Sequence, residues 1–261
     1  MKQLDLRGKT AVVTGGAGQI GRAICKALAD CGANVAVNYY SQEDFAQKLS
    51  YSLEIDYGVK SVAIQADITD KKSIEVMKKE INEKIGIADI IVNNAVFNDY
   101  EWENVLDADA ASYESQFRSS VMQAVFMAQA FVPDMIKRNY GRVIGINTEC
   151  SMQMFPCQSA YVSGKRGMDG VYKVLAREIG KNNITVNQIA PGWTITDNNR
   201  DPDPSLPNIK QSFPYISTVP MGRRGSDEEI ANAVCFIASD LASFITGNFL
   251  AVCGGNVMPS I

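Results

Sequence analysis

Short runs of Val, Ile and Ala alternate along this chain with longer segments of helical spacing, and this alternation restricts the possible folds most strongly. Apolar residues recur at helical spacing in residues 20–28 and again in residues 74–81. The strand-like runs are continuously apolar, which is typical of strands covered on both faces. These runs are Thr10–Thr14, Asn34–Asn38, Ser61–Gln65, Asp89–Val92, Arg142–Ile146, Ile184–Ile189 and Asn248–Val252.

The order of these segments predicts an α/β fold. Strands that alternate with helices form a parallel sheet with right-handed crossovers and helices on both faces. No shift in composition divides the 261 residues, so we expect a single domain over residues 1–261 with about seven strands. One long segment, residues 193–225, is rich in Pro, Asn, Asp and Ser instead. Its position after a strand predicts a lid over a substrate, with an irregular or disordered loop as the alternative.

The composition excludes several classes of function. The net charge is −4 and no run of Lys or Arg occurs, so we expect neither a nucleic-acid partner nor a membrane partner. The chain has no histidine, which removes His-dependent triads, His general bases and His-ligated zinc. Six scattered cysteines without a CxxC pair predict reduced thiols, no metal site and a cytoplasmic location. Residues 1–9 are polar and lack the apolar core of a signal peptide.

A glycine-rich turn follows the first strand and opens the first helix. It reads Thr14-Gly15-Gly16-Ala17-Gly18-Gln19-Ile20-Gly21. Glycines allow a sharp turn and a close approach of backbone N–H groups to a phosphate. The helix N-terminus adds unpaired donors and the positive end of a dipole. In this context the turn predicts nucleotide binding, although a tight turn without a ligand has the same sequence.

With four further segments, this turn makes the chain resemble the classical short-chain dehydrogenase/reductase family almost from end to end. The segments are Asn93-Asn94-Ala95, Tyr161-Val162-Ser163-Gly164-Lys165 with its YxxxK pattern, Pro191-Gly192, and Pro220-Met221-Gly222-Arg223 leading to Gly254-Gly255. The similarity is greatest to 3-oxoacyl-carrier-protein reductases and to sugar or polyol dehydrogenases. It implies a Rossmann-like fold, NAD(H) or NADP(H), and hydride transfer between a carbonyl and an alcohol.

The Tyr161–Lys165 pair carries the proposed proton chemistry. Residues four apart on a helix lie on the same face, one turn from each other. A free phenol titrates near 10, so we expect a neighbouring ammonium to lower the pKa of Tyr161 and make it a general acid/base. The resemblance also implies that Lys165 binds the nicotinamide ribose.

The chain departs from the family pattern at several positions. Gln19 replaces a glycine, and Val96 replaces the last glycine of NNAG. Thr148 stands where the catalytic serine is usual, and it retains a hydroxyl that can bind a carbonyl. Ser151 is a second hydroxyl nearby that serves as an alternative. Ser120 stands at the usual asparagine, where it either leaves room for a relay water or bonds its own helix backbone.

The resemblance extends the site to further residues. Asp67 is expected at adenine or, alternatively, in a turn before the helix near Asp70. By their position alone, four residues are expected either to flank the substrate or to serve plain packing or face solvent: Glu149, Gln153, Met154 and Trp193. The predicted catalytic set is Tyr161, Lys165, Thr148 and Ser120. The predicted cofactor set is Gly15, Gly18, Gln19, Ile20, Gly21, Asn38, Tyr39, Tyr40, Ser41, Asp67, Ile68, Asn94, Ala95, Tyr161, Lys165, Pro191, Gly192 and Thr194.

The end of the second strand bears on the choice of dinucleotide. An acid there selects NAD and a base accommodates the 2′-phosphate of NADP. This chain has neither in Asn38-Tyr39-Tyr40-Ser41. Ser41 is a candidate cap for the next helix, whose N-terminus would favour an anion, whereas Glu43 and Asp44 oppose it. On balance the pattern favours NADP(H) over NAD(H).

Two functional hypotheses remain at this point. The first is an NAD(P)-dependent carbonyl reductase or alcohol dehydrogenase with a small-molecule substrate. The alternative is a dinucleotide-binding sensor or scaffold whose chemistry has degraded, suggested by the substitutions described above. The apolar segment Val121–Met135 and the helix with Tyr161 have more apolar surface than is needed to cover one sheet. The resemblance implies a homotetramer in which these helices pair between subunits.

Overall fold

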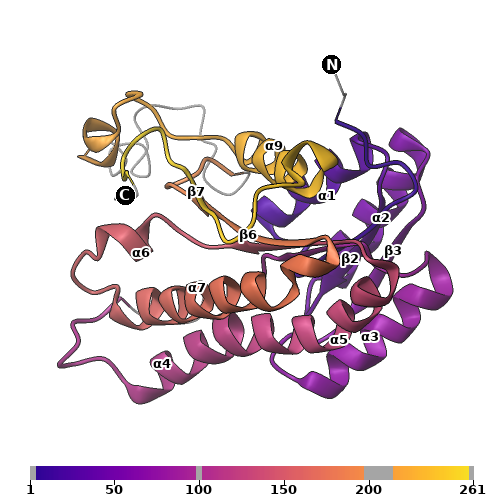
Figure 1. Cartoon of the computed structure of the whole chain (residues 1–261). Helices are drawn as coiled ribbons and strands as arrows, with labels where there is room; N and C mark the ends of the chain where they lie inside the picture. The colour runs from indigo at the N-terminus through magenta and orange to yellow at the C-terminus, as the bar shows by residue number, and fades with distance from the viewer. Residues whose placement is uncertain (1–3, 98–101, 197–213, 259–261) are drawn as a thin grey trace.

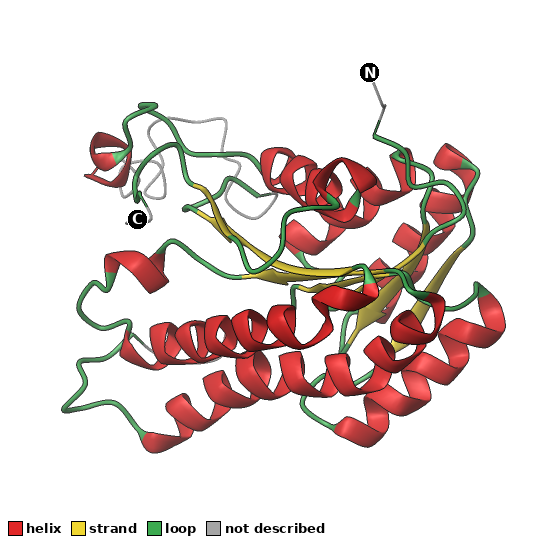
Figure 2. Ribbon diagram, viewed as in Figure 1, coloured by secondary structure: helices red, strands yellow, loops and turns green. Residues whose placement is uncertain are grey.

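Seven parallel strands form one sheet at the centre of the protein (Figures 1 and 2). The structure, a computed structural model, describes residues 4–97, 102–196 and 214–258. The strand order is β3-β2-β1-β4-β5-β6-β7, so the order reverses between β1 and β4. The strands are β1 Thr10–Val13, β2 Asn34–Tyr39, β3 Ser61–Gln65, β4 Ile90–Asn93, β5 Gly141–Ile146, β6 Ile184–Pro191 and β7 Phe249–Val252.

The predicted strands are confirmed, each within two residues at either end. Every residue of the central strands β1, β4, β5 and β6 is buried, as their continuous apolar runs indicated. The register pairs Val13 with Val37 of β2 and with Val92 of β4. These strands therefore end at nearly the same level, which brings the loops after them together.

Helices cover both faces of the sheet and bury two apolar clusters. One cluster lies between the sheet and α1, α2 and α9, and the other lies between the sheet and α3, α5 and α7 (Figure 1). This is a Rossmann-like α/β fold, as predicted. The long helices are α1 Gln19–Asp30, α2 Glu43–Tyr57, α3 Lys71–Lys84, α5 Gln123–Arg138, α7 Ser159–Ile179 and α9 Asp227–Ala238.

Side-chain caps define where two helices begin. Asp70 caps α3 by accepting hydrogen bonds from the amides of Lys72 and Ser73, close to the predicted start. At α9, Ser226 and Glu229 form a reciprocal capping box. The shorter elements are α4 Ala110–Phe117, the π-helical turn η1 Arg118–Met122, α6 Cys150–Gln153, and the 3₁₀ turns η2 Gly180–Asn182 and η3 Asp240–Ala242.

The expected lid, residues 193–225, falls partly outside the described residues, which omit 197–213. Of its described part, Ile195 forms a bridge with Ser226, and residues 214–218 form a helical turn. No helix in the described ranges combines the length and apolar character needed to cross a bilayer.

Candidate active site

The residues predicted to act together meet where β1, β4, β5 and β6 end. The glycine turn follows β1, Asn94 and Ala95 follow β4, and Thr148 lies two residues after β5. Ligands of open parallel sheets bind at the carboxyl ends of the strands, at the point where the strand order reverses. In this sheet that point lies between β1 and β4.

The glycine turn forms a cradle that fits a pyrophosphate group. Gly15 has φ +60°, and a Cβ on Gly21 would lie 2.2 Å from the carbonyl oxygen of Gly15. Helix α1 starts after Gly18 without a side-chain cap and without an acid in its first turn. Its first N–H groups and its positive dipole end therefore remain available to an anion.

Two residues that the sequence analysis missed hold this cradle in place. The Thr14 hydroxyl donates to Gln123 Oε1 at 2.6 Å and accepts from the amide of Asn94 at 2.9 Å. Gln123 Nε2 donates to the carbonyl oxygen of Ala95 at 2.8 Å. Gln123 is fully buried on α5, and the available signal was a polar residue near the start of the largely apolar segment Val121–Met135.

Gln19 and Asn94 also brace the cradle. Asn94 Nδ2 donates to the carbonyl oxygens of Thr14 and Gly15, at 3.0 and 3.2 Å. Gln19, which replaces a family glycine, accepts a hydrogen bond from the hydroxyl of Thr196 through its amide oxygen. This contact joins the start of α1 to the segment after β6.

The end of β2 presents the four predicted residues differently. Asn38 is buried: its Oδ1 accepts from the amide of Gly15 at 3.1 Å, and its Nδ2 donates to the carbonyl oxygen of Ala66 at 3.2 Å. Tyr39 is buried as well, whereas Tyr40 and Ser41 are exposed. The expectation that Ser41 caps α2 is wrong, because Gln42 occupies the N-cap position and no side chain caps this helix.

Asp67, after β3, has a structural role in the turn before α3. Its Oδ1 accepts hydrogen bonds from the amide and the hydroxyl of Thr69, at 2.8 and 2.7 Å. This is the alternative considered for Asp67, and the contact with adenine stays a prediction. Ile68 beside it is buried.

Tyr161, Thr148 and Lys165 lie together. The hydroxyls of Thr148 and Tyr161 share a hydrogen bond. Lys165 Nζ lies 5.8 Å from the centre of the Tyr161 ring and donates to the carbonyl oxygen of Ile146 at 2.7 Å. Thr148 Oγ1 also accepts from the amide of Cys150, which fixes its rotamer. A hydroxyl, a phenol and an ammonium group thus converge at the end of β5.

The pKa of Tyr161 differs from the expectation. Burial raises it above its ordinary value, the nearby Cys150 thiol adds to the rise, and the Thr148 hydrogen bond opposes it. The predicted lowering by Lys165 is not what determines this pKa, because burial of the phenol is the largest effect. Burial lowers the pKa of Lys165 to about 8. Tyr161 is consequently a neutral phenol, ready to donate a proton.

The structure separates the two hydroxyl candidates after β5. The Ser151 hydroxyl is buried and donates to the carbonyl oxygen of Thr148 at 2.8 Å. Only Thr148, of these two, contacts the phenol.

Ser120 lies in the π-helical turn that joins α4 to α5. Its hydroxyl is buried and has no hydrogen-bond partner among the described residues, so of the two alternatives the bond to its own helix backbone is absent. A buried hydroxyl of this kind leaves a polar position for a water molecule.

Comparisons with known proteins show which proteins this chain is similar to. Residues 15–256 match a family described as Enoyl-(Acyl carrier protein) reductase. The 3-oxoacyl-(acyl-carrier-protein) reductase FabG of Escherichia coli (strain K12) is 36% identical over 265 residues, which cover 98% of this chain and 100% of that protein. The enzyme of the same name from Staphylococcus aureus (strain Mu50) is 34% identical over 260 residues, 96% of this chain and 98% of that protein.

Proposed function

The chain belongs to the short-chain dehydrogenase/reductase family and is an NAD(P)-dependent oxidoreductase, and we propose that it reduces a carbonyl compound with NADPH. The observation that carries this proposal is the meeting of Tyr161, Thr148 and Lys165 beside the glycine cradle. When bound, the dinucleotide supplies the hydride.

The three residues have distinct roles in this proposal. Thr148 donates a hydrogen bond to the substrate carbonyl and orients it. Tyr161, neutral because burial raises its pKa, donates its proton to the oxygen as the alkoxide forms. Lys165 keeps two N–H donors beyond its bond to Ile146, and these bind the ribose hydroxyls. Ser120 holds a water behind this set, through which the proton is replaced.

The cofactor residues follow from the cradle. Gly15, Gly18, Gln19, Ile20 and Gly21 hold the pyrophosphate, while Asn94, Ala95, Pro191, Gly192 and Thr194 line the nicotinamide side. Asp67 and Ile68 lie at the adenine side. NADPH is favoured because the exposed residues at the end of β2, Tyr40 and Ser41, include no acid that would repel a 2′-phosphate. Fluorescence titration with both reduced cofactors tests this preference, and much tighter binding of NADH would overturn it.

The mouth of the site favours an apolar substrate. Trp102 contacts the Tyr161 ring edge to face, with centroids 5.9 Å apart. Met154, Phe155 and Trp193 are also exposed near the ends of β5 and β6. Exposed apolar side chains in such numbers indicate a binding surface rather than a polyol pocket. The relatives are named 3-oxoacyl-(acyl-carrier-protein) reductases, and we propose a 3-oxoacyl compound as the substrate of this chain.

A screen with saturating NADPH tests this proposal. We expect turnover of 3-oxoacyl thioesters and esters, and much slower turnover of sugar and polyol substrates. Steroid ketones form a third group of substrates. Their turnover would indicate a general preference for apolar carbonyl compounds, and turnover of the acyl compounds alone would indicate a preference for acyl groups. Absence of turnover in all groups despite tight NADPH binding would instead favour a binding protein without catalysis.

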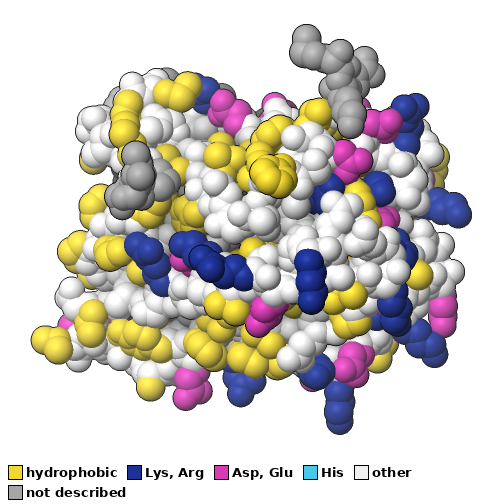
Figure 3. Space-filling view, viewed as in Figure 1, with side chains coloured by type: hydrophobic (Ala, Val, Ile, Leu, Met, Phe, Trp, Pro, Cys, Tyr) yellow, Lys and Arg dark blue, Asp and Glu magenta, His cyan; other side chains and the backbone are white. Residues whose placement is uncertain are grey.

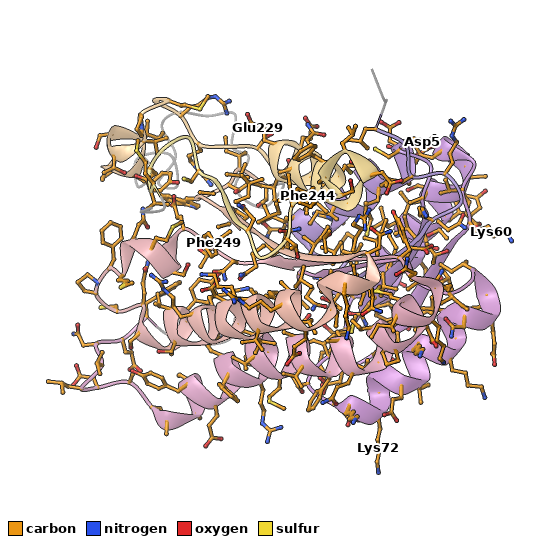
Figure 4. All side chains as sticks on the ribbon, viewed as in Figure 1. Asp5, Lys60, Lys72, Glu229, Phe244 and Phe249 are labelled. Atoms are coloured by element: carbon orange, nitrogen blue, oxygen red, sulfur yellow. The ribbon has the colours of Figure 1, made fainter. Side chains whose placement is uncertain are left out.

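We also propose a homotetramer in the cytoplasm. Hydrophobic side chains gather over α4 and α5 on one face (Figure 3), and a groove of about 640 Å³ lies between these helices and α7. Its lining includes Tyr113, Phe117, Met122 and Phe126. Phe244, which precedes the edge strand β7, is fully exposed as well (Figure 4). Such surfaces are typical of contacts between subunits.

A further inference from the structure

A buried carboxylate lies directly after the proposed catalytic threonine. Glu149 is 3% exposed, and its amide donates to the carbonyl oxygen of Pro191 at 2.9 Å, which ties it to the end of β6. Within the described ranges no Lys or Arg forms an ion pair with it. A buried charge without a cation is costly unless several hydrogen bonds satisfy it.

Two side chains from different segments donate to this carboxylate, and the amide of a third segment lies beside them. Asn256 Nδ2 donates to Oε2 at 3.1 Å, and the Tyr215 hydroxyl donates to the same carboxylate. The amide of Trp193 points to this pair, donating to the Tyr215 oxygen at 2.9 Å and interacting with Glu149. Burial raises the pKa of Glu149, and the hydrogen bonds from Tyr215 and Asn256 oppose this rise. A carboxylate oxygen accepts and does not donate, so it suits these two donors.

The segments that Glu149 joins form one wall next to Thr148. Tyr215 packs edge to face on Trp193, with centroids 5.5 Å apart. Thr218 Oγ1 donates to Asn256 Oδ1 at 2.7 Å, so the 214–218 turn and the C-terminal loop hold each other. The space between them is full, because a Cβ on Gly192 would lie 2.5 Å from the Tyr215 oxygen.

We propose that Glu149 is a positioning residue that assembles the substrate wall of this enzyme. Its carboxylate fixes Tyr215 and Asn256, and through Tyr215 it fixes the indole of Trp193 beside the reacting groups. This assignment rests on the proposed carbonyl reductase activity for its kinetic consequence. Its structural consequence, the placement of Trp193, is independent of that activity.

Fluorescence quenching tests the structural consequence. The chain has two tryptophans, so Trp193 is the single indole fluorophore in a Trp102→Phe background, read by selective excitation of tryptophan. Trp193 is 38% exposed, and release of its ring is expected to raise the acrylamide quenching constant about two-fold in Glu149→Ala. Glu178→Gln, which alters an exposed acid on α7, is the matched control and leaves quenching unchanged. Unchanged quenching in Glu149→Ala would overturn the proposal.

Kinetics with ethyl acetoacetate and NADPH test the functional consequence. We expect Glu149→Ala to raise KM for the ester about ten-fold, with kcat and the Kd for NADPH each within about three-fold of wild type. A fall in kcat with unchanged KM and unchanged quenching would contradict a positioning role. If the wild type reduces no carbonyl substrate, the proposed function fails, and the quenching experiment still decides the placement of Trp193.

A reciprocal exchange gives the sharpest control. Glu149→Gln places an amide donor opposite the Asn256 donor, so we expect it to reproduce most of the Glu149→Ala effect. Adding Asn256→Asp restores an acceptor opposite that donor and should recover KM and quenching. Tyr215→Phe is the fallback variant if Glu149→Ala does not fold. It removes one donor and leaves Glu149 in place, and we expect it to raise the acrylamide quenching constant of Trp193. Failure of both the exchange and Tyr215→Phe to shift quenching would refute the proposal.

Discussion

Lys165 donates a hydrogen bond of 2.7 Å from its buried ammonium group to the carbonyl oxygen of Ile146, the last residue of β5. Thr148 follows two residues later, so one strand end holds both the amine and the hydroxyl of the site. An ammonium group has three donors, and this bond leaves two of them for a ligand. The geometry assigns Lys165 to binding and orientation more directly than to lowering the pKa of Tyr161.

Replacing Lys165 with Met should stabilise the protein while it abolishes activity. Burial lowers the Lys165 pKa from 10.5 to about 8, so at pH 7 the folded state holds a charge that the unfolded state solvates better. We expect Lys165→Met to raise the unfolding free energy by about 1–3 kcal/mol at pH 7.

The sign of the pH dependence checks this cause. Between pH 8 and 10.5 the unfolded chain binds more protons at Lys165 than the folded protein does, so wild-type stability gains as pH rises through this window. The advantage of the Met variant should therefore shrink over the same range in denaturant titrations. An advantage independent of pH would point to packing instead.

Thr148→Val should separate the hydroxyl from the shape of this side chain. Valine keeps the volume but removes the group that bonds Tyr161, so we expect kcat/KM to fall about 100-fold. Thr148→Ser should retain activity within a few-fold, and both variants should bind NADPH normally in a fluorescence titration. Equal activity of Thr148→Val and the wild type would show that another group orients the substrate carbonyl.

The sequence predicted the sheet and its strands, because hydrophobic periodicity determines these features. The grouping of the glycine turn with Tyr161 and Lys165 came from the family resemblance and stays a prediction. It could not predict Gln123, because the partner of a buried polar residue depends on which helix packs beside β1 and β4. It placed a helix cap at Ser41, whereas the chain begins α2 two residues later, at Glu43.

Electrostatics were the least predictable part of the site. The spacing of Tyr161 and Lys165 suggested a charge effect between them, yet both groups are dominated by desolvation. Burial of this kind depends on tertiary packing and leaves no local pattern in the sequence. For the same reason the sequence placed Glu149 near the substrate but did not predict the hydrogen bonds that its carboxylate accepts.

Gly21→Ala should disable the cradle. A Cβ added at Gly21 would lie 2.2 Å from the Gly15 carbonyl oxygen, whereas a Cβ added at Gly18 would lie 3.2 Å from that oxygen. We expect Gly21→Ala to weaken NADPH binding at least ten-fold and Gly18→Ala to have a smaller effect. Gly170→Ala, on α7 with open space around it, should bind NADPH normally and gain about 0.5–1 kcal/mol of stability.

Phe117→Glu should dissociate the proposed tetramer. Phe117 is half exposed on α4 beside the apolar groove, and a charge there would be buried between subunits. We expect light scattering to report a tetramer for the wild type and a smaller species for the variant. A stable wild-type monomer would contradict the assembly.

Turnover by Tyr161→Phe tests the central claim most directly, because the substitution removes only the phenolic oxygen. With NADPH and a carbonyl substrate of the wild type, we predict NADPH binding within about three-fold of wild type and a fall in kcat of at least about 100-fold. Full turnover by Tyr161→Phe would contradict the assignment of Tyr161 as the proton donor, and with it the account of the site.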